Sequence, residues 1–335
     1  MAAALDEMGY YFNERGELRD KEHEAFKFTT QAQYEKLGDA ITEYLYEQME
    51  GRFGMERLAV RPEIDENEPS DYDQYPDESF GFIFASPDYF RKRVLVVLIH
   101  GSGAVRAGQL IINENIDEGS QFGYIQNAID RDWGVLVFNT NDNCRTNADG
   151  QRISLPFSNT PNKHSLNAWK RYIQGGHWDE IHVVAHSAGG SNISNIMDDQ
   201  REDKVKTILL TDSWFSGNIR SAFAINFKCS VISPNSTTGF AREGGRDQFW
   251  MPAGTLDHDR SSASCIDAAF YAMENWRDYH SERVAKYIFL AEVANRVRNG
   301  SVPSEIYLRN ARRKSGSQRN PEPSPSPEYP DRDSD

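Results

Sequence analysis

Four short runs of β-branched and other apolar residues recur in the middle of the chain, with helix-like stretches between them. Runs that lack a polar alternation are typical of strands buried on both faces of a parallel sheet. Strand and helix patterns that alternate in this way predict βαβ units, wound into a mostly parallel sheet with helices on both faces. The predicted strands are 94–99, 135–138, 181–185 and 205–210, and the predicted helices between them are 125–132, 166–173 and 192–200.

Weaker patterns predict further elements on either side. A hairpin with strands 10–12 and 25–28 is expected around a charged turn, followed by an amphipathic helix over 32–50. A fifth strand is expected over 229–233. Residues 263–296 are expected to form a long helix or helix pair, whose apolar stripe is Phe270, Met273, Trp276, Val284, Ile288, Phe289 and Val293.

Composition shifts divide the chain into four expected parts. Residues 1–61 form an N-terminal β/α element, and 62–79 form a linker with eight acidic residues and no basic one. Residues 80–298 form the α/β domain. Residues 311–335 form a tail rich in Ser and Pro, with five prolines between positions 321 and 330. Such a tail cannot bury enough apolar surface to fold, and we expect it to be disordered.

The charge balance limits the classes of partner. The 335 residues carry 37 basic and 51 acidic side chains, a net charge of −14. This surface repels phosphate backbones, so we expect no direct binding to nucleic acid. The longest plain apolar run has six residues (94–99), well below the roughly 20 that span a bilayer, so no membrane association is expected.

The cysteines and the start of the chain indicate an intracellular protein. Three cysteines without a C-x-x-C spacing predict neither a disulfide framework nor a zinc site. The first residues lack the basic and apolar regions of a signal peptide. We expect no cofactor and no metal, because the remaining histidines show no spacing typical of ligands.

The strongest chemical signal is Ser187, in the sequence Ala-His-Ser-Ala-Gly-Gly at 185–190. It approximates G-x-S-x-G directly after a predicted buried strand and before a predicted helix. A nucleophile elbow needs tiny flanking residues, because the strained turn lifts the serine hydroxyl above the sheet. The alternative interpretation is that Ser187 is only a small residue at a tight packing point.

Asp212 and His258 follow in the chain order Ser, acid, His of α/β-hydrolases. In that arrangement His258 takes the serine proton, while Asp212 orients the imidazole and balances its charge. The alternatives are that Asp212 caps a helix or bonds to a loop, since the acid usually follows one strand later, and that His258 is an ordinary surface residue. His100 and His186 are expected to pack or to orient loops.

An oxyanion hole is expected from backbone N–H groups near the serine. His-Gly-Ser-Gly at 100–103 follows the first predicted strand of the series. The donors are expected at Gly101 and Ser102, together with Ala188, the residue after the nucleophile.

These motifs resemble one known family. The segments 96–114, 184–190, 210–213 and 253–258 are similar to the argonaute-binding-protein-two (Arb2) domain, and most to its animal branch of cotranscriptional regulators. That branch also has the N-terminal element found here as Tyr-Phe-Asn-Glu-Arg-Gly-Glu-Leu at 11–18. The resemblance covers roughly residues 9 to 290.

The resemblance implies an α/β-hydrolase-like fold in a protein that acts through partners. It implies a nuclear adaptor, also present in the cytoplasm, that links Argonaute-type and chromatin proteins to alternative splicing. The elbow serine of the family corresponds to Ser187. The alternative function is a serine hydrolase of esters or thioesters that uses Ser187, Asp212 and His258.

Overall fold

The computed structural model describes residues 3–61, 75–102, 108–147, 149–200, 202–218, 222–229, 241–242, 247–281 and 283–300. Residues 1–301 form one compact unit. A search of the described helices found none with the length and hydropathy that a membrane span requires. The predicted tail, 311–335, and most of the predicted acidic linker lie outside the described residues.

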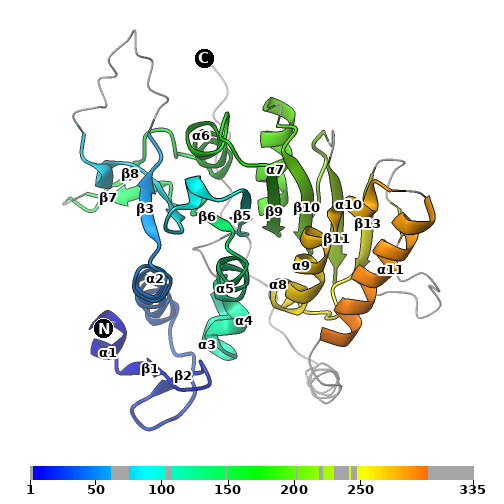
Figure 1. The fold of residues 1–335 in the computed structure, drawn as a ribbon. Coiled ribbons are helices and arrows are strands. Elements are labelled where there is room, and N and C mark those ends of the chain that lie inside the picture. Colours follow the sequence, from blue (N-terminus) through cyan, green and yellow to red (C-terminus); the bar gives the residue numbers. More distant parts are fainter. Residues whose placement is uncertain are drawn as a thin grey trace, which may run out of the picture. The chain divides into compact units, whose positions relative to one another are not determined.

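The centre of the fold is a mostly parallel sheet, which confirms the predicted fold class (Figure 1). Its edge strand β12 is short and antiparallel to β13, and β3 and β4 form an antiparallel pair at the opposite edge. Counted along the chain without β12, the strands lie in the order 1-2-4-3-5-6-7-8, which is typical of α/β-hydrolases. Across the sheet the strands are β12 (Ala241–Arg242), β13 (Gln248–Pro252), β11 (Phe223–Lys228), β10 (Val205–Thr211), β9 (Glu180–His186), β5 (Val94–Ile99), β6 (Gly134–Phe138), β4 (Phe82–Ala85) and β3 (Glu56–Ala59).

Helices cover both faces of the sheet. Successive side chains of each buried strand point to opposite faces, and because both sets are apolar, each face packs against helices. In β5, Val96 and Leu98 pack on one face, whereas Leu95 and Val97 pack on the other. One face is covered by α6 (Pro161–Tyr172) and α7 (Gly189–Asp199) (Figure 1). The other face is covered by α2 (Gln31–Phe53), α3 (Gly108–Asn113), α4 (Ile116–Gly119), α5 (Phe122–Asp130), α9 (Ile266–Glu274), α10 (Trp276–Tyr279) and α11 (Arg283–Gly300).

One predicted strand was misplaced. The hairpin pairs β1 (Tyr10–Phe12) with β2 (Leu18–Asp20), not with 25–28. The Asn13 side chain accepts the backbone N–H groups of Arg15 and Glu17, and this tight turn brings the chain back at once. The predicted strand 229–233 is wrong at its first residue, where β11 has already ended, and residues 230–233 lie outside the described residues.

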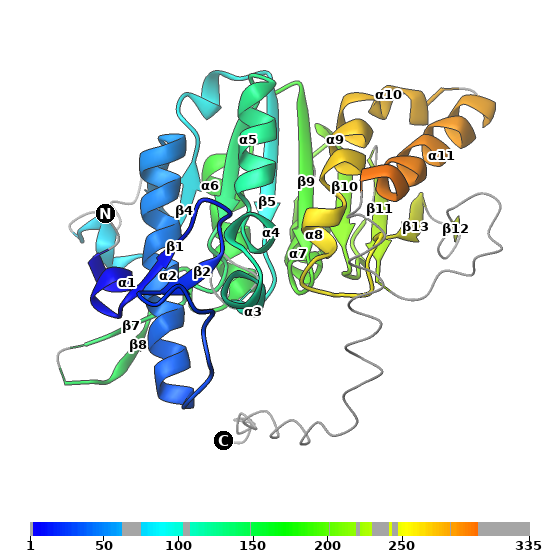
Figure 2. The same ribbon diagram turned by 90° about the horizontal axis from the view of Figure 1, so that it is seen from below.

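The predicted helix 32–50 is confirmed as α2, which packs against the N-terminal hairpin (Figure 2). Thr30 caps its start, and its side chain accepts the N–H of Gln33. The rings of Phe12 and Tyr44 lie 4.9 Å apart between β1 and α2. Helix α1 (Ala3–Glu7) packs beside them, with Leu5 fully buried. The N-terminal segment therefore shares the core of the sheet.

The expected terminal helix is divided into α8 (Ser261–Ser264), α9, α10 and α11. Phe270, Met273, Phe289 and Val293 of the predicted stripe are buried, and Trp276 is partly buried. Val284 and Ile288 are 69% and 59% exposed, so this part of the stripe was wrong. All four predicted stripe positions after residue 280 lie on α11, whose buried side is formed by Phe289, Leu290, Val293, Ala294 and Val297, so the predicted stripe combined two different sides of this helix.

Shorter elements complete the described part of the chain. The hairpin of β7 (Cys144–Thr146) and β8 (Arg152–Ser154) lies between β6 and α6 in sequence. The 3-10 turns are η1 (Asp77–Ser79) and η2 (Tyr89–Arg91). Arg61 lies 2.7 Å from the carboxylate of Asp77, so an ion pair joins the residue before the predicted linker to the described end of the linker.

Candidate functional site at the carboxyl ends of the strands

Ser187 lies on a sharp turn between β9 and α7. Its φ of +50° falls in the left-handed region that non-glycine residues rarely adopt. The backbone N–H of Ser187 donates to Thr211 O at 3.2 Å, and the hydroxyl of Ser213 donates to Ser187 O. These contacts hold the turn from both sides. The side chain of Ser187 is half-buried at the edge where the parallel strands end.

Two glycines allow the backbones around Ser187 to approach closely. A Cβ at Gly189 would lie 2.6 Å from the carbonyl oxygen of Ile99, so only glycine fits where α7 meets the end of β5. A Cβ at Gly101 would lie 2.9 Å from Ser187 Cβ and 3.4 Å from its Oγ. The loop after β5 therefore runs directly beside the serine hydroxyl, as the predicted oxyanion hole requires.

The remaining predicted oxyanion donors lie near the surface. Gly101 is buried, whereas Ser102 and Ala188 are exposed. Within the described residues, the N–H groups of Ser102 and Ala188 have no hydrogen-bond partner. They are available to a ligand, and their role as oxyanion donors stays a prediction.

Asp212 and His258 are brought together by the ends of three strands. Asp212 follows β10, the neighbour of the serine's strand, and its φ of +45° turns the side chain over the end of β11. One carboxylate oxygen accepts the N–H of Cys229 at 3.0 Å, and the other lies 2.6 Å from His258 Nδ1. Asp212 therefore follows a strand one earlier than is usual for the acid, and its side chain extends over the end of β11 to contact His258.

The contact with His258 stabilises the ionised carboxylate of Asp212. Partial burial by itself raises the pKa of this group. The hydrogen bonds from His258 and from the backbone of Cys229, with the attraction of the imidazole, outweigh burial and hold the pKa below its ordinary value. Asp212 is thus kept as an anion that can orient the Nδ1–H of His258.

Ser187 and His258 are not joined by a hydrogen bond in this structure. Within the described residues, the Ser187 hydroxyl forms no hydrogen bond with His258. The Asp212–His258 pair is formed and the Ser187–His258 pair is not, an arrangement that unliganded hydrolases can also have. The catalytic roles of all three residues stay predictions.

Sequence reasoning missed Arg260, which anchors the loop that carries His258. Its guanidinium lies 2.8 Å from Glu114 and 3.4 Å from Glu118, and its side chain is only 8% exposed. The hydroxyl of Ser261 also donates to His258 O at 2.7 Å. The Nε of Arg260 also lies 3.8 Å from the carboxylate of Asp257. A buried arginine with three carboxylate partners fixes the position of this loop, and no local pattern identifies the two partners that lie more than 140 residues away.

His186 packs against His258, which agrees with the expectation that it packs or orients a loop. Its ring lies 4.7 Å from that of His258, and its Nδ1 lies 3.0 Å from Thr211 O. Burial, with the neighbouring His258, lowers the pKa of His186 to about 4. Burial likewise lowers the pKa of His100 to about 4 and that of His164 to about 3, so these histidines are neutral near pH 7. The position of His186 directly before Ser187 was the available signal.

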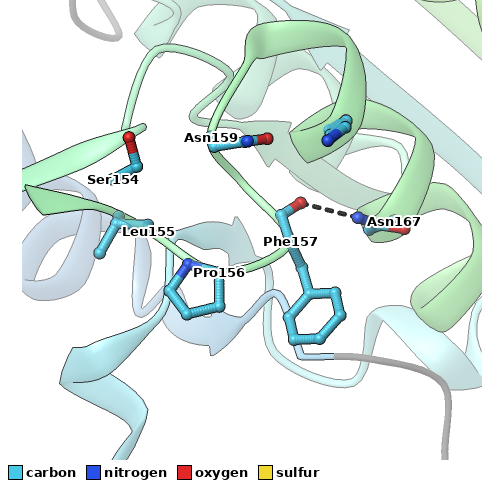
Figure 3. A pocket seen from close by; sticks show the side chains of 7 residues that line it. Ser154, Leu155, Pro156, Phe157, Asn159 and Asn167 are labelled. Atoms are coloured by element: carbon cyan, nitrogen blue, oxygen red, sulfur yellow. Dashed lines mark hydrogen bonds between the residues drawn. The ribbon is translucent and has the colours of Figure 1, made fainter. Parts of the chain in front are cut away.

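A separate pocket of about 540 Å³ is formed between β8 and the start of α6 (Figure 3). The Nδ2 of Asn167 donates to Phe157 O at 2.7 Å beside it. None of the predicted site residues lines this pocket. Its lining residues are Ser154, Leu155, Pro156, Phe157, Asn159, Lys163 and Asn167.

Comparison with curated proteins identifies similar chains. The FAM172 family protein homolog Y75B8A.31 of Caenorhabditis elegans is 39% identical, over 81% of this chain and 87% of its own length. The cotranscriptional regulator ARB2A of Mus musculus is 30% identical, over 62% of this chain and 63% of its own length. The chain thus spans less than two thirds of the mouse relative.

Solved structures are similar only at a low level. The histone deacetylase Clr3 is 12% identical, with a TM-score of 0.43 over 81% of this chain and 41% of that chain. A histone deacetylase from Saccharomyces cerevisiae is 11% identical, with a TM-score of 0.44 over 74% of this chain and all of that chain. Similarity at this level bears on neither activity nor partners.

The family itself is shown by its sequence model. The model of the Arb2 domain matches residues 1–224, which include β9, Ser187 and Asp212. The match confirms the resemblance inferred from the motifs. This chain belongs to the Arb2 domain family.

Proposed function

We propose that this protein is a nuclear cotranscriptional regulator that acts as an adaptor. The observation that carries the proposal is its relationship to proteins named cotranscriptional regulator ARB2A, including the mouse protein at 30% identity. The expected partners are Argonaute-type, chromatin and splicing proteins, and a cytoplasmic fraction is expected beside the nuclear one. The net charge of −14 supports recruitment through proteins rather than direct contact with nucleic acid.

Affinity purification of the full chain from nuclear extract tests this function. We expect Argonaute-type, chromatin or splicing proteins to co-purify, and a Ser187→Ala variant to retain them, because an adaptor needs the surface and not the nucleophile. Recovery of none of these classes from nuclear extract, or exclusion of the tagged protein from the nucleus, contradicts the proposal.

A second function is favoured by the site geometry: hydrolysis of an ester or thioester. The supporting observations are the 2.6 Å contact of His258 Nδ1 with Asp212 and the φ of +50° at Ser187. Ser187 Oγ would attack the acyl carbonyl while His258 Nε2 accepts its proton, and Asp212 would stabilise the imidazolium. N–H groups at Gly101, Ser102 and Ala188 would bind the oxyanion.

The acyl group would then leave Ser187 by the reverse proton path. His258 gives its proton to the departing alcohol or thiol, which leaves the acyl-enzyme. It then takes a proton from the water that attacks the acyl-enzyme, and it returns that proton to Ser187 Oγ as the acid departs. The products are a free acid and a regenerated serine, so no co-reactant besides water is needed.

A fluorophosphonate probe tests this chemistry on the folded protein. We expect covalent labelling of wild type, loss of labelling in Ser187→Ala, and at least ~100-fold slower labelling in His258→Ala, because the general base is gone. Asp130→Asn, an exposed acid on α5, serves as the matched control and should label as wild type. A well-folded wild type that is never labelled removes the hydrolase function.

A further inference from the structure

Three side chains with metal-ligating atoms converge next to Ser187. His186, His258 and Asp259 each offer one such atom, and these atoms lie within 4.8 Å of one another. His186 comes from the end of β9, whereas His258 and Asp259 come from the loop after β13. Two imidazoles and one carboxylate form the donor set of catalytic zinc sites that leave a further position open.

The hydrogen bonds of both histidines leave the same ring nitrogen available. Nδ1 of His258 lies 2.6 Å from the Asp212 carboxylate, and Nδ1 of His186 lies 3.0 Å from the carbonyl oxygen of Thr211. A carboxylate and a carbonyl oxygen only accept, so these two contacts favour the tautomer with the proton on Nδ1 and the lone pair on Nε2. The hydroxyl oxygens of Thr211 and Ser261, 3.2 and 3.4 Å from His186 Nδ1, can accept the same proton. Histidine ligands of metals are oriented in this way, by a carboxylate or a backbone carbonyl at the other ring nitrogen.

The third donor is free and its loop is fixed. Within the described residues, the Asp259 carboxylate forms no ion pair. Its backbone N–H donates to the side chain of Asp257 at 3.1 Å, and the next residue, Arg260, is anchored by Glu114 and Glu118. The carboxylate is therefore held near the two imidazoles without a competing cation.

From this geometry we propose that Nε2 of His186, Nε2 of His258 and the carboxylate of Asp259 bind a divalent cation of the zinc class. Imidazole and carboxylate donors suit Zn²⁺, and water or substrate would complete the coordination. Because the metal occupies the His258 lone pair that would accept the Ser187 proton, the metal-bound state and the proton-accepting state exclude one another. Zn²⁺ is therefore a reversible inhibitor at this site, a consequence that rests on the proposed hydrolase function.

Calorimetric titration of Zn²⁺ into the full, chelator-treated chain measures binding without reference to activity. A Cys144→Ser background removes the half-buried thiol from competition. We expect one site per chain, with affinity lowered at least ~10-fold in Asp259→Asn and in His186→Gln. Asp267→Asn, an exposed acid on α9, is the matched control and should bind as the background protein. Titration of Co²⁺ should give the visible absorption of a coordinated ion.

The outcomes separate the metal site from the hydrolase. Ser187→Ala should bind Zn²⁺ as strongly as the parent chain. In the parent, Zn²⁺ should suppress fluorophosphonate labelling and a chelator should restore it. A chain that binds Zn²⁺ and is never labelled loses only the hydrolase function. Absence of Zn²⁺ binding, or equal affinity in the folded Asp259→Asn variant and the parent, overturns the metal site.

Discussion

Two of the site residues, Ser187 and Asp212, have positive φ angles although neither is glycine, at +50° and +45°. Such conformations cost about 1 to 2 kcal/mol each and persist only where surrounding contacts impose them. Here the Ser213 hydroxyl holds the serine turn, and the N–H of Asp212 donates to Phe227 O at 2.7 Å. The backbone thus stores strain where two side chains must point away from their strands.

Replacement of Ser187 by glycine tests this strain. Ser187→Gly should be more stable than Ser187→Ala by about 0.5 to 1 kcal/mol. Glycine removes the steric strain of a Cβ at positive φ, and this gain exceeds the cost of the larger conformational entropy that glycine gives the unfolded chain. Both variants lack the hydroxyl, so their comparison isolates the backbone. Denaturant unfolding followed by circular dichroism measures the difference, and equal midpoints would show that the turn is unstrained.

A pair of glycine substitutions separates close packing from helix propensity. Gly189→Ala should destabilise the protein by about 2 kcal/mol or more, because its Cβ would meet the backbone oxygen of Ile99 at 2.6 Å. Gly51→Ala, on the exposed side of α2 with no atom within 4 Å, should stabilise it by about 0.5 to 1 kcal/mol. Thermal unfolding measures both, and a Gly189→Ala variant as stable as wild type contradicts the packing argument.

At the scale of elements, the candidate site is predictable where its residues directly follow strands. Ser187 directly follows β9 and Asp212 directly follows β10, so the patterns of buried strands placed both residues at one edge of the sheet. The path of Asp212 over β11 depends on a left-handed backbone at a residue that gives no local sign of it. The ion pairs of Arg260 and the ring contact of His186 with His258 join segments that are far apart in the sequence. No local sequence pattern predicts such contacts.

The loop that carries His258 depends on the buried Arg260. Arg260→Met should cost about 2 kcal/mol of unfolding free energy, because it removes the cation that Glu114, Glu118 and Asp257 share. Arg93→Met is the control, since Arg93 and Asp179 are 88% and 51% exposed and such pairs contribute about 0 to 1 kcal/mol. Urea unfolding of both variants measures the contrast, which an equal loss in the two would contradict.

Glu180 ties the start of β9 to α10 and gives the protein an acid-sensitive contact. The pKa of Glu180 is lowered to about 2, and the hydrogen bond with His182 is the largest cause. Burial raises this pKa, whereas the contacts with Trp276 and Arg277 lower it further. An acid with a depressed pKa stabilises the folded state above its unfolded pKa, and this stabilisation is lost as pH falls toward the folded value.

Glu180→Gln should therefore be less stable than wild type at pH 7, by on the order of 1 to 2 kcal/mol, since part of the contact is open to solvent. The difference should shrink as the pH falls from about 4.5 toward 2, the window between the ordinary and the lowered pKa. Glu292→Gln, an exposed site on α11, serves as the control. Unfolding curves across this pH range check the sign, and a gap that widens at low pH would contradict it.

At the scale of the whole molecule, the buried parallel strands were predictable and the edges were not. Strands 94–99, 135–138, 181–185 and 205–210 agree with β5, β6, β9 and β10 within two residues, because burial on both faces selects nearly unbroken apolar runs. In β11, Asn226 interrupts the apolar pattern, and its side chain donates to Ser213 O at 2.6 Å. The edge strand β3 and its neighbour β4 have only four residues each, too few for a clear period.

The N-terminal segment then emerges as part of the main fold. Strand β3 pairs with β4 in the central sheet, and Leu37, Ile41, Leu45 and Met49 of α2 are buried in the core that β5, β6 and β11 also line. Deletion of residues 1–61 should therefore prevent folding, because it uncovers one face of the sheet and leaves β4 without its outer neighbour. Hydrogen exchange and near-ultraviolet circular dichroism of the truncated chain measure this loss.

Supplying the segment in trans distinguishes lost packing from a general failure of the shortened chain. If α2 and β3 complete the core, residues 1–61 expressed as a separate chain should bind residues 62–335 and restore a cooperative thermal transition. Leu45→Ala in the short chain should weaken this rescue, because Leu45 is fully buried and its truncation costs about 2 to 5 kcal/mol. Glu47→Ala, on the exposed side of the same helix, should not. If residues 62–335 fold with native cooperativity on their own, the N-terminal segment is instead a separate element, and the core it shares with the sheet adds little to stability.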